Sequence, residues 1–383
     1  MKRLLCWILI FGVLGAALPP GAAAAEQEIP GKSALLMDIA TGKVLFEKNA
    51  HEALAPASVT KVMTMLLIME AIDSGALSWN DTVTASEAAA AKGGSQIYLK
   101  VGETMTVADM VKSIAVSSAN DCACAMAEHI AGSEAAFVEK MNQRARELGM
   151  ADTHFVNCTG LDDSEEAKNH LTCAYDFALM SRELLKYHPD ILKYTTIWMD
   201  TVRNGQFGLS NTNKLIRFYP GATGLKTGFT SGAGYCLSAS AERDGLGLIA
   251  VVMGCETSAQ RFTACKQLLD QGFATYALVT PEAPDARVGV KLGLQPQVRA
   301  IPAEDTQLLV EKSQKSLVET QVALELEVEA PVSKGQRLGT LTVTAGGQTL
   351  AQIPLVAEEA VPRLTFGQIF LKILRRVTMA AEG

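Results

Sequence analysis

The chain has 383 residues, of which 48% are hydrophobic and 20% are charged, and its net charge at pH 7 is −7. This length suits two domains, and the composition excludes a disordered or fibrous protein. An acidic chain without a Lys/Arg cluster in its body also excludes nucleic acid as a partner, because binding nucleic acid requires a basic face.

The first 25 residues have the pattern of a secretory signal peptide. Lys2 and Arg3 precede an apolar run over residues 4–18, and the small residues 22–25 offer a cleavage site before residue 26. A retained membrane span is the alternative, but the run is short for a span and a proline pair ends it. We therefore expect an exported protein, whose mature net charge is −9 because Lys2 and Arg3 are lost.

The mature chain keeps seven cysteines, and this odd number leaves at least one thiol unpaired. Cys122 and Cys124 are two positions apart in a predicted helix, so they point in different directions and are poorly placed to pair. No CxxC spacing indicates a zinc site. We interpret the cysteines as small buried hydrophobic side chains, and the sequence leaves their disulfide state open.

Residues 26–276 alternate strand and helix patterns and are predicted to form the first folded domain. Two short strands, 33–38 and 42–46, flank a turn near its start. The helix predicted over 57–74 is apolar on nearly every side, so it belongs in the middle of a core. Further helical patterns cover residues 107–116, 121–131, 134–148 and 173–186.

The end of this domain is rich in strand patterns. Asp244-Gly245 is a strong hairpin signal between strands 235–241 and 246–253, and a helix over 261–275 closes the domain. Helices gathered around an antiparallel sheet define an α+β fold.

Residues 277–357 are predicted to form a second, β-rich domain. Apolar and polar residues alternate over 323–328 and 340–344, and Gly346-Gly347 turns the chain into an apolar run at 350–355. Several short strands with no convincing helix predict a small all-β sandwich. Because no titratable cluster with a catalytic pattern is present there, we interpret this domain as a spacer or docking module.

The last segment, residues 358–383, is predicted to contain a basic amphipathic helix. Apolar residues recur at helical spacing between residues 361 and 379, whereas Lys372, Arg375 and Arg376 lie largely off that stripe. A helix of this kind at a terminus is typical of the membrane interface. The alternative is a helix docked on its own domain. We expect peripheral attachment to the outer face of the cytoplasmic membrane.

Three short motifs carry the candidate chemistry, and each would be weak alone. Their order along the chain makes the signal specific. The motifs are Ser58-Val59-Thr60-Lys61, Ser118-Ala119-Asn120 and Lys226-Thr227-Gly228.

Ser58 and Lys61 are the candidate nucleophile and base. Ser58 opens the buried helix, where backbone N–H groups favour negative charge, and Lys61 lies three residues on, on the same helical face. A lysine becomes a base when burial or a neighbouring positive charge, here Lys226, lowers its pKa. The alternatives are a helix N-cap and a surface lysine, but Lys61 stands inside an apolar stretch.

The other two motifs have ordinary alternatives as well. Ser118 and Asn120 stand between two predicted helices, where Ser118 would relay a proton and Asn120 would hold a substrate amide, although both residue types also cap helices. Lys226 and Thr227 would face the substrate from a strand, and Gly228 would let a substrate backbone pair with the strand edge. The alternative for Lys226 is an ordinary hairpin lysine.

These motifs resemble the low-molecular-mass penicillin-binding proteins of the DD-carboxypeptidase family, within the penicilloyl serine transferase superfamily. Residues 55–61 are similar to the nucleophile segment of that family and residues 224–230 to its strand with the KTG motif. The resemblance implies a β-lactamase/transpeptidase-like catalytic fold that removes D-alanine from peptidoglycan stem peptides ending in D-Ala-D-Ala. It also implies covalent inhibition by β-lactam antibiotics, with no cofactor and no metal.

The resemblance extends to individual positions near the site. It implies that the backbone N–H groups of Ser58 and Phe229 form the oxyanion hole, that Arg261 binds the substrate carboxylate, and that Ser95 lies near the site entrance. Phe229 departs from relatives that carry histidine directly after the KTG motif, which affects fine substrate preference but not the class of reaction.

Two alternatives remain open at this point. Residues 165–169 mimic the ExxxN loop of class A β-lactamases, although the leucine before asparagine is missing and the loop lies too far beyond Ser118. A non-catalytic penicillin-binding sensor is the second alternative, which the intact motifs disfavour. The five histidines are scattered without an HExxH metal motif, and no GxSxG elbow indicates another class of serine hydrolase.

Overall fold

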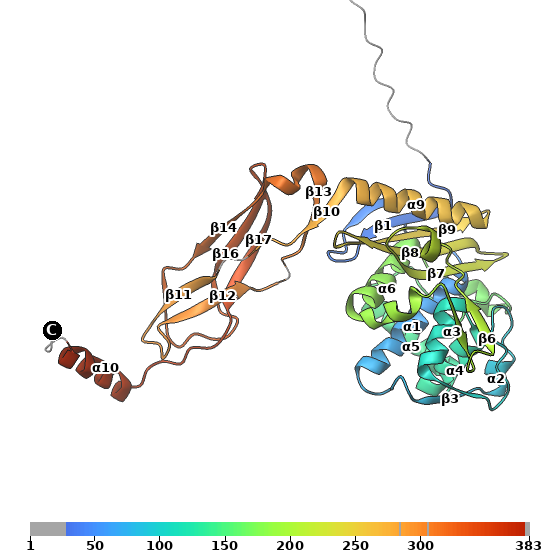
Figure 1. Ribbon diagram of the computed structural model, residues 1–383, viewed down its shortest axis with the longest axis horizontal. Helices are drawn as coiled ribbons and strands as arrows, with labels where there is room; N and C mark the ends of the chain where they lie inside the picture. The colour runs from blue at the N-terminus through green and yellow to red at the C-terminus, as the bar shows by residue number, and fades with distance from the viewer. Residues whose placement is uncertain (1–27, 283–284, 305, 380–383) are drawn as a thin grey trace, which may run out of the picture.

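The computed structural model describes residues 28–379 apart from residues 283–284 and 305, so the predicted signal peptide lies outside the described residues. Figure 1 shows a mixed helix and sheet domain, a separate body of strands and a helix at the C-terminal end. The predicted order of an α+β domain, a β-rich domain and a terminal helix is therefore confirmed.

The first domain is built on a five-stranded antiparallel sheet with the strand order β2-β1-β9-β8-β7. Asp244 and Gly245 join β8 to β9 with φ angles of 51° and 78°, the positive values that a tight hairpin turn requires. The strands are β1 (Ser33–Asp38), β2 (Val44–Lys48), β7 (Ala222–Thr230), β8 (Gly234–Arg243) and β9 (Leu246–Cys255).

Helices cover both faces of this sheet (Figure 1). Helix α9 (Ser258–Thr275) packs on one face, and α6 (Ala174–Tyr187) packs on the other beside α1 (Lys61–Asp73). The structure starts α9 three residues before the predicted position, because Thr257 and Gln260 form a capping box. A separate apolar core lies on each side of the sheet.

The predicted buried helix over 57–74 is divided in the structure. Residues Ala57–Thr60 form a 3₁₀ turn, and α1 begins only at Lys61. The helix is buried as predicted, because residues 61–66 and the apolar residues 68 and 69 are all buried, so its apolar side chains are not confined to one face. Ser58 therefore lies in the 3₁₀ turn that precedes α1, and not in the α-helix itself.

The remaining helices of the first domain agree with the predictions to within about one residue: α3 (Val107–Ser117), α4 (Asn120–Ala131) and α5 (Glu134–Glu147). Several short elements were not predicted, because three or four residues carry too little periodicity. They are β3 (Thr82–Thr84), α2 (Glu87–Ala90), β4 (Thr104–Thr106), the 3₁₀ turns Glu166–Asn169 and Pro189–Ile191, α7 (Leu192–Thr195), β5 (Met199–Val202), β6 (Phe207–Ser210) and α8 (Leu215–Phe218).

The second domain is all-β, as predicted, with the strand order β14-β16-β17-β12-β11-β15 around its own apolar core. A ribbon of β10 (Tyr276–Val279) and β13 (Leu308–Glu311) joins it to α9. The other strands are β11 (Ala286–Lys291), β12 (Gln297–Pro302), β14 (Val318–Leu324), β15 (Glu327–Glu329), β16 (Arg337–Ala345) and β17 (Gln348–Ala357).

Two details of this domain differ from the sequence patterns. The alternation over 323–328 is interrupted, because β14 ends at Leu324 and β15 begins at Glu327, leaving the Leu326 side chain 99% exposed between them. A 3₁₀ helix, Lys312–Leu317, also forms where no helix was predicted. All seven cysteines of the described chain are buried free thiols, in agreement with their interpretation as small hydrophobic side chains.

The C-terminal helix α10 (Phe366–Met379) begins five residues after the start of the predicted apolar pattern. Within the described part of the chain, no helix is long and apolar enough to cross a membrane. Large apolar side chains on α10 are nevertheless exposed: Phe366, Phe370, Leu371 and Ile373.

Candidate active site

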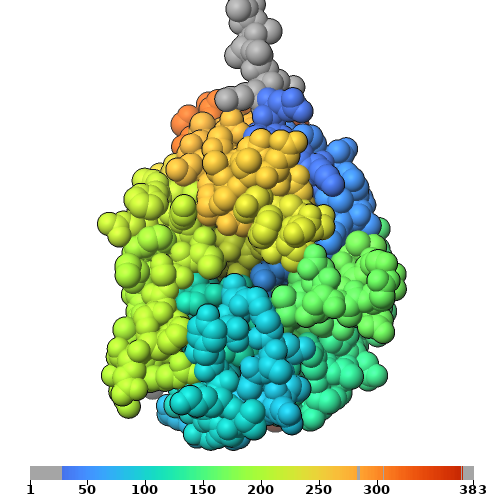
Figure 2. Space-filling model, turned by 90° about the vertical axis from the view of Figure 1, so that its right-hand side faces the viewer, coloured from blue at the N-terminus to red at the C-terminus, as the bar shows by residue number. Residues whose placement is uncertain are grey.

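The 3₁₀ turn that carries Ser58 packs directly against strand β7. Figure 2 shows the blue N-terminal part of the chain at the bottom of a hollow, bordered by cyan, green and yellow segments. A Cβ atom on Gly228 would lie 2.8 Å from the carbonyl oxygen of Pro56 and 3.1 Å from the backbone nitrogen of Ser58. Gly228 is therefore required by this close approach of β7 to the nucleophile turn, rather than only by pairing with a substrate.

Lys61 is buried and its Nζ atom lies 3.0 Å from the Ser58 Oγ atom, which confirms that the two side chains share one face. The same ammonium donates to the carbonyl oxygen of Thr159 at 2.7 Å. Burial lowers the pKa of Lys61 to about 7, outweighing the charges that raise it. A neutral amine at hydrogen-bond distance from a hydroxyl is the arrangement that a general base requires.

Lys226 lies on β7 and is buried, and its Nζ atom donates to the carbonyl oxygen of Thr227 at 2.9 Å. Burial holds the pKa of Lys226 well below its usual range, and the positive charges of Lys61 and Arg261 lower it further. The two lysines are thus close enough for Lys61 to lower the pKa of Lys226, but burial and not Lys226 accounts for the lowered pKa of Lys61. Lys226 is not an ordinary hairpin lysine, because its side chain points into the protein.

Ser118 and Asn120 stand at the junction of α3 and α4. Ser118 has a φ angle of 63°, the left-handed region, and Ala119 occupies the N-cap position of α4 without a side-chain bond. The Ser118 Oγ and Asn120 Oδ1 atoms are buried and have no hydrogen-bond partner within the described chain. These two side-chain oxygens therefore do not cap a helix.

The Asn120 amide is held in place by the segment before it. Its Nδ2 atom donates to the carbonyl oxygen of Gly93 at 2.7 Å, and its backbone N–H donates to the carbonyl oxygen of Ser95 at the same distance. Ser95 thus lies beside Asn120, in agreement with its predicted place near the site. This packing leaves the Asn120 Oδ1 atom without a hydrogen-bond partner in the described chain.

The side chains around the KTG motif differ in their exposure. The Thr227 hydroxyl donates to Thr212 Oγ1 at 2.7 Å, whereas Phe229 is 51% exposed and stacks on Tyr235 with 4.2 Å between ring centroids. Arg261 is buried and donates from Nη1 to the carbonyl oxygen of Gly228 at 2.9 Å. Arg261 therefore stabilises β7 through the Gly228 carbonyl. Its role toward a substrate carboxylate stays a prediction.

The loop at residues 157–161 also contributes to the site, although no motif in the sequence pointed to it. The Asn157 Oδ1 atom accepts hydrogen bonds from the backbone N–H groups of Thr159 and Gly160 at 3.1 and 2.6 Å, which presents the Thr159 carbonyl to Lys61. Asn157 and Gly160 in the stretch Asn-Cys-Thr-Gly are residues typical of a turn, but a turn signal does not say what the turn contacts.

Replacing Gly160 with alanine is expected to lower both stability and the rate of acylation of Ser58. Gly160 has a φ angle of 80°, and its Cβ atom would lie 1.8 Å from the carbonyl oxygen of Ala57, so the nucleophile turn must move. Gly132→Ala is a matched control, with a φ angle of 81° and no atom within 4 Å of the added Cβ. Thermal melting and penicillin acylation of both variants check this, and equal effects would contradict it.

The candidate β-lactamase loop lies on the surface. The Glu165 side chain is 88% exposed and forms an ion pair with Lys168 rather than reaching toward Ser58. The interpretation of residues 165–169 as a charged loop is thereby supported.

Away from Ser58, three side chains of types that can bind metals lie close together, which the histidine spacing did not predict. Ligand atoms of His51, Asp152 and Cys173 lie within 4.8 Å of one another. The Asp152 carboxylate contacts the His51 ring at 3.3 Å and accepts from the Cys173 thiol at 3.7 Å. Cys173 also caps α6, so these contacts have a structural role in the fold.

Comparisons with known proteins identify relatives along both domains. A sequence profile of D-alanyl-D-alanine carboxypeptidases matches residues 21–257, and one of the C-terminal domain of penicillin-binding protein 5 matches residues 273–363. The chain is 44% identical over 380 residues to a D-alanyl-D-alanine carboxypeptidase of Bacillus subtilis, covering 96% of each chain. It is 35% identical to an Escherichia coli enzyme of the same name, over 89% of this chain and 88% of that one.

Solved structures agree with these relatives. Penicillin binding protein 5 of Haemophilus influenzae superposes with a TM-score of 0.75 at 30% identity, covering 91% of this chain and 100% of that one. Penicillin-binding protein D2 of Listeria monocytogenes, in its ampicillin-bound form, gives a TM-score of 0.59 at 32% identity over 64% of this chain and 99% of its own. The site geometry and these comparisons together show that the chain belongs to the D-alanyl-D-alanine carboxypeptidase family.

Proposed function

We propose that this protein is a serine D-Ala-D-Ala carboxypeptidase that removes the terminal D-alanine from peptidoglycan stem pentapeptides. The observation that carries this proposal is the buried Lys61 amine, whose pKa is lowered to about 7 and which lies 3.0 Å from the Ser58 hydroxyl. A serine hydroxyl is a weak nucleophile until such a base takes its proton. Membership of the family supports the same activity.

In the acylation step, Lys61 takes the proton of Ser58 while Oγ attacks the carbonyl carbon between the two terminal D-alanines. Negative charge then develops on the carbonyl oxygen, and the backbone N–H groups of Ser58 and Phe229 stabilise it. The close contact of β7 with the Ser58 nitrogen, permitted by Gly228, supports this assignment.

Collapse of the intermediate breaks the peptide bond and requires a proton on the leaving amine. Ser118 passes that proton from the lysine pair, Lys61 and Lys226, while the Asn120 Oδ1 atom accepts from a substrate amide. Water then attacks the Ser58 ester and releases the shortened peptide. A penicillin acylates Ser58 by the same attack on its lactam carbonyl, with the lactam nitrogen as the tethered leaving group.

Two rival functions predict different products. A class A β-lactamase needs a carboxylate base for rapid deacylation, and the exposed Glu165 paired with Lys168 does not supply it. A non-catalytic sensor would be acylated by penicillin through the same Ser58 and Lys61, but it would release no D-alanine from a peptide.

The test incubates the mature protein with labelled penicillin and, separately, with a peptide ending in D-Ala-D-Ala. A stable adduct mapped to Ser58 by mass spectrometry, together with released D-alanine, is expected. Rapid turnover of penicillin without a lasting adduct would indicate a β-lactamase instead. An adduct without D-alanine release from a pentapeptide would indicate a sensor.

We also propose that the enzyme is exported and attached to the outer face of the cytoplasmic membrane through α10. The signal-peptide pattern at residues 1–25 supports export. The exposed apolar side chains Phe366, Phe370, Leu371 and Ile373 support attachment, because an exposed apolar helix face gains free energy by entering the interface.

Deleting residues 366–383 is expected to reduce binding to vesicles that contain anionic lipids to the background level. The apolar face and the basic residues of the tail would both be lost, whereas Ser58 and its surroundings would be unchanged. Cosedimentation with vesicles measures binding, and D-alanine release from a soluble peptide is the control that should not change. A shortened protein that still cosediments fully would contradict attachment through this helix.

A further inference from the structure

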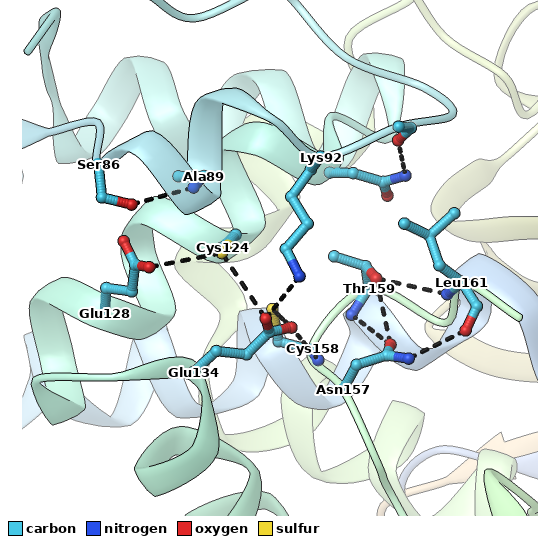
Figure 3. A network of polar contacts seen from close by, with 12 residues as sticks. Ser86, Ala89, Lys92, Cys124, Glu128, Glu134, Asn157, Cys158, Thr159 and Leu161 are labelled. Carbon is cyan, nitrogen blue, oxygen red and sulfur yellow. Dashed lines mark hydrogen bonds and ion pairs between the residues drawn. The ribbon is translucent and has the colours of Figure 1, made fainter. Parts of the chain in front are cut away.

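Lys92, Glu134 and Cys158 form a polar network that the proposed mechanism does not use, and it contacts Lys61 through the next residue, Thr159. Figure 3 shows Lys92 reaching toward Glu134, with Cys124 and Cys158 beside the same carboxylate. The Lys92 Nζ atom lies 2.6 Å from Glu134 Oε2, and Glu134 Oε1 accepts from both the backbone N–H and the thiol of Cys158 at 3.2 Å. One carboxylate thus joins α5 to two segments that are distant in the sequence.

The peptide that Glu134 holds leads directly to the catalytic lysine. The Cys158 carbonyl accepts from the Thr64 hydroxyl at 2.6 Å, so this residue is fixed at both its N–H and its C=O. The next residue, Thr159, presents its carbonyl to Lys61 Nζ at 2.7 Å. Because Cys158 is fixed, the adjacent Thr159 carbonyl is fixed as well, and this carbonyl holds Lys61 Nζ within 3.0 Å of the Ser58 Oγ atom.

The other end of the ion pair leads to the substrate-binding amide. Lys92 immediately precedes the segment 93–95, whose Gly93 and Ser95 carbonyls accept from the Asn120 side chain and backbone at 2.7 Å. The two loops also meet, because a Cβ atom on Gly94 would lie 3.3 Å from the Leu161 side chain. The pair of Lys92 and Glu134 thus fastens the loop beside Asn120 to the loop beside Lys61.

We propose that Glu134 and Lys92 are positioning residues for acylation, which hold the 157–161 loop so that the Thr159 carbonyl keeps Lys61 Nζ against Ser58. This inference rests on the proposed function, because it needs Ser58 to be acylated.

The rival explanation is that Glu134 only stabilises the start of α5. An acidic residue in the first turn favours a helix N-terminus, and Ser133 already caps this one by accepting from the Ala136 N–H at 3.1 Å. That role needs a negative charge near the helix end, but it does not need the bond to Cys158 or the pair with Lys92. Loss of a helix-stabilising charge would lower the melting temperature and leave the chemistry of Ser58 unchanged.

The test measures penicillin acylation by rapid mixing in Glu134→Ala, Glu134→Gln and Lys92→Met. The matched control is Glu183→Gln, because the Glu183 pair with Arg144 on the same helix has the same 2.6 Å length and a similar exposure, 20% against 22% for Glu134. That pair joins α5 to α6 instead of to the 157–161 loop. All rates are taken per mole of folded protein.

We expect the acylation rate constant at saturating penicillin to fall roughly tenfold to a hundredfold in Glu134→Ala, as for a misplaced catalytic group. Glu134→Gln keeps an oxygen acceptor for the Cys158 N–H and should retain more activity than Glu134→Ala. In the Glu134 variants the dissociation constant for the noncovalent penicillin complex should change much less than the rate constant, because Glu134 holds the loop that positions Lys61. Lys92→Met can also weaken binding, because Lys92 precedes the segment that holds Asn120. Glu183→Gln should match the wild type in both constants.

The pH profile gives a second readout. The Thr159 carbonyl stabilises the protonated form of Lys61, so releasing it should move the acid limb of acylation to lower pH. Of the groups that face Lys61 from other elements, Asp121, His170 and Lys226 keep their surroundings in these variants. Cys158 loses its bonds to Glu134 in Glu134→Ala but keeps them in Lys92→Met, so the two variants are compared.

Each outcome decides one question. A wild-type protein that is not acylated would overturn the proposed function itself. A wild-type protein that is acylated, with Glu134→Ala and Lys92→Met keeping its rate constant and acid limb, would overturn only the positioning role. Lower melting temperatures with unchanged kinetics would assign Glu134 to the helix end. Should Glu134→Ala not fold, Glu134→Gln and Lys92→Met carry the test, because the first weakens the contact with Cys158 and the second removes the ion pair, while both keep an oxygen of residue 134 for the Cys158 N–H.

Discussion

Replacing Ser58 with alanine is expected to abolish penicillin acylation and to lower D-alanine release by roughly a millionfold, as loss of a catalytic serine does. No other hydroxyl takes its place, because the Lys61 Nζ atom lies 3.0 Å from this Oγ atom and its other bond is to a carbonyl. The fold should be preserved, since the substitution removes a single oxygen from a 3₁₀ turn with no side-chain cap.

The control for this variant is Ser74→Ala at the opposite end of the same helical segment. The Ser74 hydroxyl donates to the Ala71 carbonyl at 3.0 Å on the surface, so its loss should leave both activities unchanged. Intact-protein mass spectrometry after incubation with penicillin reads the adduct directly. An adduct of normal yield on purified Ser58→Ala would show that another residue is the nucleophile.

Replacing Lys61 with arginine is expected to lower the acylation rate by roughly a hundredfold to ten-thousandfold, the range that general-base catalysis contributes. Arginine keeps a cation beside Ser58, but it does not lose its proton in the accessible pH range. Because the longer side chain must fit a fully buried position, Lys61→Met is a second variant of similar length that removes the base without adding volume.

The pH dependence distinguishes loss of the base from disturbance of the fold. Burial disfavours the ammonium form and lowers the pKa of Lys61 to about 7, so wild-type acylation should rise as the pH passes upward through that value. The neutral amine is the active form, and it predominates above this pKa. In Lys61→Arg the rise near pH 7 should disappear. A variant that keeps both the rate and the rise would show that another group is the base.

Lys112→Arg is the matched control for the arginine substitution. Lys112 forms ion pairs with Asp109 and Asp200 at 3.2 Å, and arginine can keep both of them. Its acylation rate and pH profile should equal those of the wild type.

Predictions that depend on neighbouring residues agree with the structure. Ser58 and Lys61 are three positions apart, so one turn of helical backbone is enough to bring their side chains together. The Asp244-Gly245 hairpin and the Ser133 cap also follow from local backbone chemistry. The shift of the α1 start to Lys61 is small, since it changes the turn and not the shared face.

The sequence also established the order of the three motifs and hence the family, but it did not reveal what surrounds them. Ser118 and Asn120 had the composition of helix caps, and only packing showed that their buried oxygens have no partner in the described chain. Arg261 was placed correctly near the KTG strand, yet its bond to the Gly228 carbonyl depends on how α9 packs on β8 and β9.

Sequence alone thus determined the pairing of the candidate nucleophile Ser58 with Lys61, the α+β and all-β order of the domains and the amphipathic tail. The tertiary structure decided which distant groups act on them. Thr159 meets Lys61 across 98 residues, Glu134 meets Cys158 across 24, and Gly160 packs on Ala57. The physical reason is that a pattern of neighbours specifies one turn or one face, whereas these contacts exist only after separate elements have packed around a common core.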